Sequence, residues 1–540
     1  MVASHSAKRI SDAARFARWD ALPDSHFDGI GLPRPQAQAV QSQLHGHLVF
    51  KGDPTYDSDR QLFNPMFDAY PGVVAFCLTE ADVALALQLG QVVPGGFCLR
   101  SGGHSTAGYS TGNGVLIDVS ALNNVSVDPV NLIATVGPGC NFGKLYQELE
   151  TYGLHVPAGE CPDVCVGGFV QGGGYGFTSV SFGLNCDNVL SFRVMLADGS
   201  IVVADAQTNA DLFWALRGGT GGNFGIVLTV AYTLRPLAAV TGFALAWPLT
   251  SASGIAQAAA AMMALQTSYM RTSICGPWMN LQVSLCFQNW LDPSQPAPPP
   301  GTPLQPYFMV RGMWLGNLSA LGPLLAPLQA LPGCITQWVL QGTFRTLNHK
   351  LLNYPQSMPM LDQMPFEDKS SFYIDQDLTL AQWAGLLTLF AGAPNNMAYG
   401  YGEFYGGAIN AVPTYDTAFV HRGAALNMVM DVYWLLNKDR AACEGFLAAW
   451  NAALAALSNG ESYQNYPNAA DLNYVQRFWG AAYPVLQIIK AKYDPGNAFA
   501  FAQQVWAQPG VGALVDPGVP KAVAAALGQP VVPLVARVGG

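Results

Sequence analysis

Charged residues are scarce in this sequence. Only 11% of its 540 residues are Asp, Glu, Lys or Arg, and 35 acidic residues against 25 basic ones give a formal net charge of −10. Nucleic-acid phosphates are bound by concentrated basic surfaces, and the chain has neither a basic run nor zinc-finger spacing. The composition therefore argues against a nucleic-acid partner.

Long apolar runs are missing as well. The apolar stretch at 253–266, SGIAQAAAAMMALQ, is shorter than the about 20 residues needed to cross a bilayer of roughly 30 Å. The N-terminal segment MVASHSAKRISDAARFARWD contains basic residues but no continuous apolar core of the kind found in secretory signals. We therefore expect a soluble protein without a membrane partner, cytoplasmic by default, with secretion left open.

The cysteines form no recognisable pattern. There are ten of them, with no CxxC pair and no dense disulfide framework for a chain of this length. Cys161 and Cys165 are four positions apart but have no His or Cys partner at zinc-ligand spacing. We therefore predict no metal site and expect most cysteines to be small buried apolar residues.

What the sequence does contain is typical of a folded, loop-rich chain. Hydrophobic residues make up 50% of it, with 57 glycines and 37 prolines. At 540 residues, two domains are expected, with a binding site in the cleft between them.

The pattern of short runs predicts an α+β fold. Between about residues 72 and 237, β-type runs such as GVLIDVS and GIVLTVAYTL alternate with segments of helical spacing at 79–93 and 141–153. From about 238 to 465, longer strand-like runs, Pro-rich loops and Ala/Leu-rich helices indicate a second domain. The segment 479–499 reads as a helix closed by a Pro/Gly turn.

Three glycine-rich stretches mark the first part of the chain: SGGHS (101–105), GGFVQGGGYG (167–176) and RGGTGGNFGI (217–226). Glycines allow the backbone to approach a ligand closely and its N–H groups to converge on an anion such as a pyrophosphate. A dinucleotide is therefore plausible. The Rossmann alternative, VGPGCNFG at 136–143, has its third glycine one residue late and lies outside a first βα unit.

Several motifs together resemble one family. RSGGHS, GECPDVCVGGFVQGGGYGF, DLFWALRGGTGGNFGIV, FYGGAINAV, TAFVHR, NYPN and KYDPGNAF follow one another between about residues 70 and 505. In this order they resemble the berberine-bridge-enzyme-like branch of the vanillyl-alcohol-oxidase (PCMH-type) FAD flavoproteins.

The resemblance implies an architecture and a cofactor. We expect a PCMH-type FAD-binding domain at 35–237 and a substrate-binding domain at 238–465, with an antiparallel sheet flanked by helices. A C-terminal return to the FAD domain follows at 466–510, and the tail at 511–540 is unassigned. FAD is expected to be held by two covalent bonds, from His104 to its 8α-methyl group and from Cys161 to ring carbon C6. The same motifs imply cofactor contacts at Arg100, Ser101, Gly102, Gly103, Ser105, Gly167, Gly168, Gly173, Gly174, Gly176, Gly222, Asn223, Gly225, Ile226 and Asn497.

This chemistry suits the residue types. An imidazole or a thiolate can add to an electron-poor oxidised flavin, whereas a buried neutral cysteine cannot. One departure from the family pattern leaves an alternative open: the usual VGVGG is VCVGG here, so Cys165 replaces a glycine and could be the reacting thiol.

Oxidising an alcohol also requires a base for the hydroxyl proton. The resemblance to sugar-oxidising members implies a tyrosinate, for which Tyr466 in SYQNYPN fits best, with Tyr463 and Tyr474 as register alternatives. Its acidic partner is expected to be Glu403 in GEFYGG, with Asp431 as second choice. His421 and Arg422 are expected to fix a strand turn rather than to act in the chemistry.

These residues predict an FAD-linked oxidoreductase acting on CH–OH donors. The leading expectation is an oxidase that takes a hydride onto flavin N5 from an alcohol or hemiacetal carbon of a carbohydrate or secondary metabolite and reduces O2 to H2O2. Two alternatives stay open: a dehydrogenase of the same fold that excludes O2, and an inactive ligand-binding homologue. The oligomeric state is not predicted.

Overall fold

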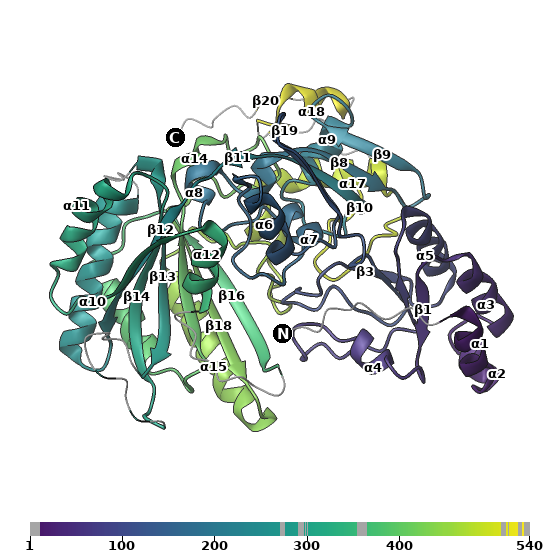
Figure 1. The fold of residues 1–540 in the computed structure, drawn as a ribbon, viewed down its shortest axis with the longest axis horizontal. Helices are drawn as coiled ribbons and strands as arrows, with labels where there is room; N and C mark the ends of the chain where they lie inside the picture. Colours follow the sequence, from purple (N-terminus) through teal and green to yellow (C-terminus); the bar gives the residue numbers. More distant parts are fainter. Residues whose placement is uncertain are drawn as a thin grey trace.

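The computed structural model confirms the α+β class (Figure 1). Its three larger sheets have four, five and seven strands. The structure describes residues 11–270, 276–289, 296, 299, 301–353, 364–508, 515–516, 518–527 and 532–533. The Pro-rich loop near 292–300 and the tail after 510 therefore lie largely outside the described residues, as does Cys275.

The first sheet has four strands in the order β1-β2-β4-β3. Strands β2, β4 and β3 are parallel, and β1 joins β2 antiparallel. Their bounds are β1 His47–Phe50, β2 Val73–Phe76, β3 Phe97–Arg100 and β4 Val115–Asp118. The predicted helix at 79–93 is α5 (Glu80–Val92), which begins with a capping box between Thr79 and Asp82.

Three short helices precede this sheet: α1 (Asp12–Asp20), α2 (Asp24–Asp28) and α3 (Arg34–Gln43). Trp19 and Phe27 are fully buried in the core that these helices share with the sheet. These three helices are therefore an integral part of the fold.

The second sheet is antiparallel, with the order β5-β6-β10-β8-β9. Its bounds are β5 Val125–Asp128, β6 Ile133–Val136, β8 Val189–Met195, β9 Ile201–Asp205 and β10 Ile226–Thr233. The helices beside it include α6 (Phe142–Glu150), α7 (Val166–Gln171) and α9 (Ala210–Ala215). The predicted strand runs of this region and the predicted helix at 141–153 are confirmed.

The third sheet has seven antiparallel strands in the order β15-β12-β14-β13-β17-β18-β16. Their bounds are β12 Val240–Pro248, β13 Met279–Gln288, β14 Gln305–Trp314, β15 Ile335–Gly342, β16 Phe366–Ile374, β17 Tyr399–Phe404 and β18 Leu426–Trp434.

The two faces of this sheet contact different parts of the molecule. One face packs against a group of long helices, of which α10 and α11 lie at the left of Figure 1. These helices are α10 (Ala252–Leu265), α11 (Leu318–Gln329), α13 (Leu380–Ala391) and α15 (Asn437–Ala455). Because side chains alternate along a strand, Tyr399, Tyr401 and Glu403 of β17 share the opposite face. That face carries the candidate site.

The end of the chain returns to the first part of the molecule. Helix α17 (Tyr483–Tyr493) packs against α9, and its Lys490 Nζ donates a 2.5 Å hydrogen bond to the backbone oxygen of Asn223. The division into 35–237 with 466–510, and 238–465, stays a prediction.

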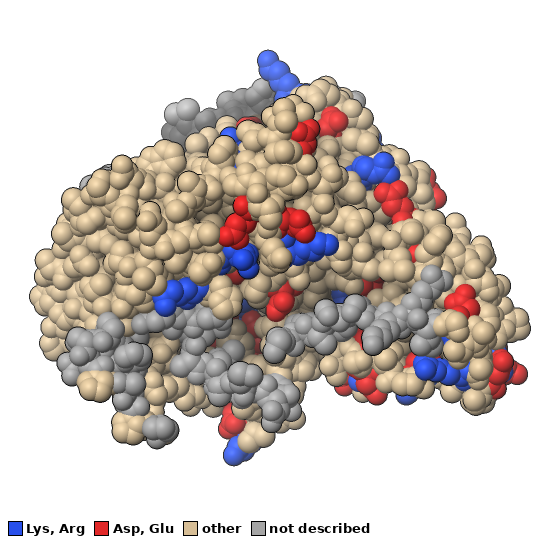
Figure 2. All heavy atoms as spheres, in the orientation of Figure 1, with Lys and Arg blue, Asp and Glu red and all other residues tan. Residues whose placement is uncertain are grey.

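The surface carries few charges. On the face shown in Figure 2, acidic and basic side chains are sparse and mixed, without a basic patch. Within the part of the chain that the structure describes, every helix is too short or too polar to be a membrane span.

Candidate active site

A cavity of about 850 Å³ lies between the first part of the chain and the seven-stranded sheet. Its walls include the loop at 101–110, the segment from Gly159 to Phe169, and side chains of β16, β17 and β18. The loop at 464–467 completes them. A volume of this size is within the range of cofactor and ligand pockets.

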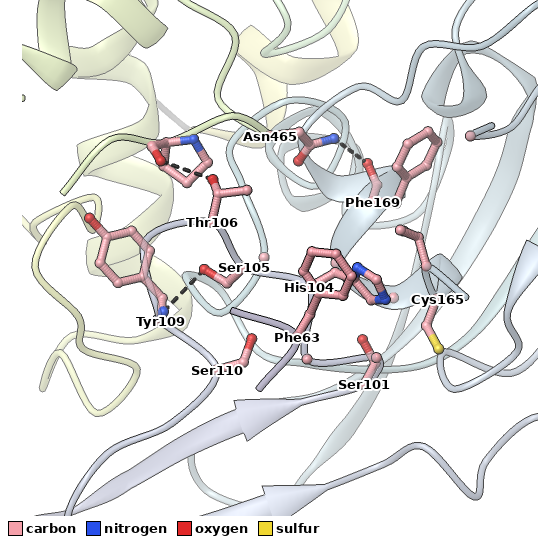
Figure 3. A pocket seen from close by; sticks show the side chains of 18 of the residues that line it. Phe63, Ser101, His104, Ser105, Thr106, Tyr109, Ser110, Cys165, Phe169 and Asn465 are labelled. Atoms are coloured by element: carbon pink, nitrogen blue, oxygen red, sulfur yellow. Dashed lines mark hydrogen bonds between the residues drawn. The ribbon is translucent and has the colours of Figure 1, made fainter. Parts of the chain in front are cut away.

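His104 stands on the loop that follows β3, inside this cavity (Figure 3). Its ring stacks on Phe63 with centroids 4.6 Å apart. Its Nε2 is buried without a hydrogen-bond partner among the residues that the structure describes. Burial lowers the pKa of His104 to about 4, and the ammonium of Lys369 acts in the same direction. The imidazole is therefore neutral at physiological pH, with a nitrogen lone pair free to react.

The two candidate thiols differ in their surroundings. Both line the cavity, but Cys165 is buried and its Sγ donates a 3.3 Å hydrogen bond to the Gly139 backbone oxygen, whereas Cys161 is partly exposed. Burial raises the pKa of Cys165 to about 12 and also raises that of Cys161. Cys161 is the more accessible of the two, and each must lose a proton before it can act as a nucleophile.

The position of Cys165 also explains why residue 102 is a glycine. A Cβ atom on Gly102 would lie 2.9 Å from the Cys165 Sγ and 3.1 Å from its backbone nitrogen. Only glycine therefore lets the loop of His104 approach the start of α7 so closely.

Ten of the predicted cofactor contacts besides His104 and Cys161 line the cavity. They are Arg100, Ser101, Gly102, Gly103, Ser105, Gly167, Gly168, Gly222, Gly225 and Ile226. Arg100 is held in place by a buried 2.5 Å ion pair with Asp118. A Cβ atom on Gly168 would meet no atom within 4 Å and would occupy cavity space.

The other five predicted contacts lie outside the cavity lining. Gly173, Gly174 and Gly176 allow close packing, since a Cβ atom on each would clash with Phe419, Phe169 or Ala158. The side chains of Asn223 and Asn497 bind backbone groups of the C-terminal segment. Asn223 accepts a 2.8 Å hydrogen bond from the Val505 backbone nitrogen, and Asn497 accepts one of 2.9 Å from the Ala507 backbone nitrogen. Their contact with a cofactor stays a prediction.

These residues fit FAD. The cavity offers a glycine-rich cradle, an imidazole whose Nε2 has no hydrogen-bond partner in the described part of the chain, and a thiol that shares the same space. When bound, FAD would lie against the glycines near 102, 167 and 222, beside His104 and Cys161.

Tyr466 lies in the cavity wall with Glu403 behind it. The Tyr466 hydroxyl donates a 2.6 Å hydrogen bond to Glu403 Oε1, and Asn427 Nδ2 donates a 2.9 Å hydrogen bond to Oε2. Burial raises the pKa of Glu403 to about 8, against the opposite effect of both hydrogen bonds. Burial and the Glu403 charge raise the pKa of Tyr466 well above its ordinary value. Two strongly coupled acids therefore form one dyad.

The register alternatives make other contacts. The Tyr463 hydroxyl accepts hydrogen bonds from the Gly174 backbone at 2.8 Å and from Asn465 Nδ2 at 3.0 Å. The Tyr474 hydroxyl donates to the Gln504 backbone oxygen at 3.1 Å, and neither tyrosine lines the cavity.

Asp431 lines the cavity but pairs with a lysine that the sequence analysis did not identify. Lys369 Nζ lies 3.2 Å from Asp431 Oδ2 and 3.3 Å from Glu367 Oε1. Burial raises the pKa of Asp431 to about 7. Glu367 and Lys369 lie on one face of a strand, and this spacing was a signal in the sequence, because charged residues on a buried strand are rarely found without a partner.

His421 and Arg422 make structural contacts, as expected. The His421 ring bonds to Glu461 at 2.8 Å and to Gln464 at 3.0 Å, and Arg422 forms two hydrogen bonds of 2.8 and 2.6 Å with Asp187.

Two family descriptions match the chain. The family described as "FAD binding domain" matches residues 71–205, and the one described as "Berberine and berberine like" matches residues 462–505. The second match contains Tyr466 and the first contains His104 and Cys161.

Relatives are found along most of the chain. The FAD-linked oxidoreductase YvdP of Bacillus subtilis is 29% identical over 482 residues, which cover 86% of this chain and 98% of that protein. Glucooligosaccharide oxidase of Sarocladium strictum is 27% identical over 82% of this chain and 89% of its own.

Solved structures of similar fold include enzymes of the same kind. Xylooligosaccharide oxidase from Myceliophthora thermophila C1, in complex with xylobiose, matches with a TM-score of 0.72 and 25% identity over 85% of this chain and 97% of that one. Physcomitrella patens BBE-like 1 matches with a TM-score of 0.76 and 24% identity over 87% and 99%. The chain thus carries the FAD-binding region and the berberine-like region of FAD-linked oxidoreductases, enzymes that act on CH–OH donors, and resembles such enzymes along most of its length.

Proposed function

We propose that the protein is an FAD oxidase with doubly attached flavin that converts an alcohol or hemiacetal carbon of a carbohydrate-like substrate to a carbonyl. The overall reaction takes two hydrogens from the substrate and gives them to O2, forming H2O2. Bound FAD supplies the two-electron acceptor, which takes the hydride from the substrate carbon.

The hydrogen bond between Tyr466 and Glu403 carries this proposal. With one proton between them, the two side chains form an anionic dyad in which the Tyr466 oxygen accepts the substrate hydroxyl proton while its own proton moves to Glu403. Because Tyr466 lines the cavity and Glu403 does not, the phenol is the member that meets substrate.

Aromatic side chains on the same sheet face support a sugar-like substrate. Tyr399 and Tyr401 stack with centroids 5.4 Å apart, and Tyr433 lies beside them in the cavity wall. Such rings offer both apolar faces and hydroxyl groups to a polyhydroxylated ligand. The relatives that act on glucooligosaccharides and xylooligosaccharides point to the same substrate class.

Incubation of the flavin-loaded protein with a panel of mono- and oligosaccharides and secondary alcohols tests the proposal. We expect at least one sugar to bleach the flavin under anaerobic conditions and to yield one H2O2 per product molecule in air. Bleaching without H2O2 formation in air would instead identify a dehydrogenase that excludes O2.

A further inference from the structure

The wall of the cavity contains a buried lysine whose position is unusual. Lys369 stands on β16, opposite Asp431 of β18 in the sheet register, and its side chain is only 10% exposed. Its ammonium group points into a region lined by tyrosines rather than into solvent. Burying a charge costs free energy unless nearby groups of opposite charge compensate it.

Two carboxylates compensate the charge. Lys369 Nζ lies 3.3 Å from Glu367 Oε1 and 3.2 Å from Asp431 Oδ2. The second oxygen of each carboxylate is buried without a hydrogen-bond partner among the described residues. The oxygens that do have partners face the lysine, and Asp431 Oδ2 also accepts a 3.2 Å hydrogen bond from the Tyr433 hydroxyl.

The ammonium also faces the proposed base. Lys369 Nζ lies 4.8 Å from the ring centroid of Tyr466, within the range of cation–π contact, and 3.5 Å from the hydroxyl oxygen of Tyr401. The Tyr401 and Tyr466 rings meet edge to face at 6.0 Å. The same positive charge lowers the pKa of Glu403, the other member of the dyad.

The carboxyls beside Lys369 do not fully cancel the electrostatic effect of its ammonium group on the dyad. Burial raises the pKa of Asp431, against the lowering effect of the Lys369 ammonium, and so weakens this carboxyl as a counter-charge. The titratable groups packed around the lysine and the dyad are His104, Glu160, Glu367, Tyr401, Glu403, Asp431, Tyr433 and Tyr463.

We propose that Lys369 is a positioning residue of the reaction: its ammonium stabilises the anionic, singly protonated form of the Tyr466–Glu403 dyad, which removes the substrate proton. Glu367 and Asp431 hold the ammonium in place and limit the strength of its effect. This inference rests on the proposed role of Tyr466.

Replacement of the lysine by an apolar residue of similar length tests it. In Lys369→Met, we expect the pH at which flavin reduction by substrate is half-maximal to rise by about one to three pH units, since this is the usual effect of an opposite charge at such distances. At pH 7 the anaerobic reduction rate should fall at least about tenfold, because each unit corresponds to a factor of ten in the reactive form. Lys369→Arg, which keeps a cation over the ring, should restore most of the rate.

Two further variants separate electrostatics from packing. Glu367→Gln removes one counter-charge and should move the half-maximal pH downward, the opposite direction to Lys369→Met. In the Lys369→Met background, a fluorinated tyrosine at position 466, whose phenol is more acidic, should recover the rate at pH 7. A purely structural lysine predicts neither the opposite shift nor the recovery.

The outcomes distinguish this inference from the proposed function. If Tyr466→Phe retains rapid reduction by substrate, the proposed base is wrong and the lysine proposal falls with it. If Tyr466→Phe abolishes reduction but Lys369→Met, with flavin fully attached, keeps the wild-type pH profile, only the lysine proposal is overturned.

Discussion

The Tyr466 hydroxyl donates a 2.6 Å hydrogen bond to Glu403, and so joins a loop of the C-terminal segment to the centre of the seven-stranded sheet. Thr106 of the His104 loop donates a 2.9 Å hydrogen bond to the Pro467 backbone oxygen, next to the tyrosine. Asn465 Nδ2 similarly bonds to the Phe169 backbone oxygen of α7 at 2.9 Å (Figure 3). The loop of the proposed base is thus hydrogen-bonded to the loop of His104 and to the glycine-rich segment that contains Phe169.

Tyr466→Phe removes the proton acceptor but little volume. We expect flavin to remain attached and its reduction by substrate to slow by about 10²–10⁴-fold, the usual contribution of a general base. Stopped-flow absorbance under anaerobic conditions measures this rate. Tyr474→Phe is the matched control, because its hydroxyl donates to the Gln504 backbone and the residue does not line the cavity, and it should keep the wild-type rate.

The activity should increase with pH. Because Glu403 has a pKa of about 8, the dyad carries two protons below that pH and becomes the anionic base above it. The rate of flavin reduction should therefore rise as pH increases through about 8. In Glu403→Gln we expect this ionisation to disappear from the profile and the rate to fall; an unchanged profile would assign the ionisation to another group.

Glu403 should also link stability to pH. Its folded pKa of about 8 lies above its ordinary value of 4.5, so the folded protein holds this proton more tightly than the unfolded chain. The resulting contribution is complete below about pH 4.5 and is lost as pH rises through about 8. Relative to wild type, the Tm of Glu403→Gln should therefore increase between pH 5 and pH 9. A Tm difference that stays constant over this range would contradict the raised pKa.

Arg422 should stabilise the fold without acting in the reaction. It pairs with Asp187 in two hydrogen bonds and both side chains are largely buried, so Arg422→Met leaves an uncompensated carboxylate. We expect the free energy of unfolding to fall by about 3–5 kcal/mol. Denaturant unfolding measures this loss, and Arg422→Met with Asp187→Asn should lose less than Arg422→Met alone. Equal losses would mean that the ion pair is not the cause.

Local sequence patterns were enough to predict the α+β class and several elements. Apolar spacing predicted α5 and α6, and the short β-type runs predicted most strands of the first two sheets, because these elements depend on neighbouring residues; β1 and β5 were not predicted. Motif order also identified the pair Tyr466 and Glu403, although 63 positions separate them.

Contacts set by distant strands could not be predicted. Lys369 meets Asp431 only because β16 lies beside β18 at the edge of the third sheet, an arrangement that no local pattern specifies. Likewise, the sequence does not show that Gly173 and Gly174 adopt positive φ angles and pack against Phe419 and Phe169; their predicted contact with a cofactor stays untested. A run of glycines indicates that another group approaches the backbone closely, but it does not show whether that group is a ligand or a side chain.

The attachment of flavin is the central claim, and intact mass after acid precipitation tests it most directly. The wild-type pellet should be yellow and heavier than the bare chain by one FAD. His104→Ala and Cys161→Ala should each keep that mass, and the double variant should lose it. Cys165→Ala, the matched control, should keep both bonds. A colourless wild-type pellet with the mass of the unmodified chain would contradict the account.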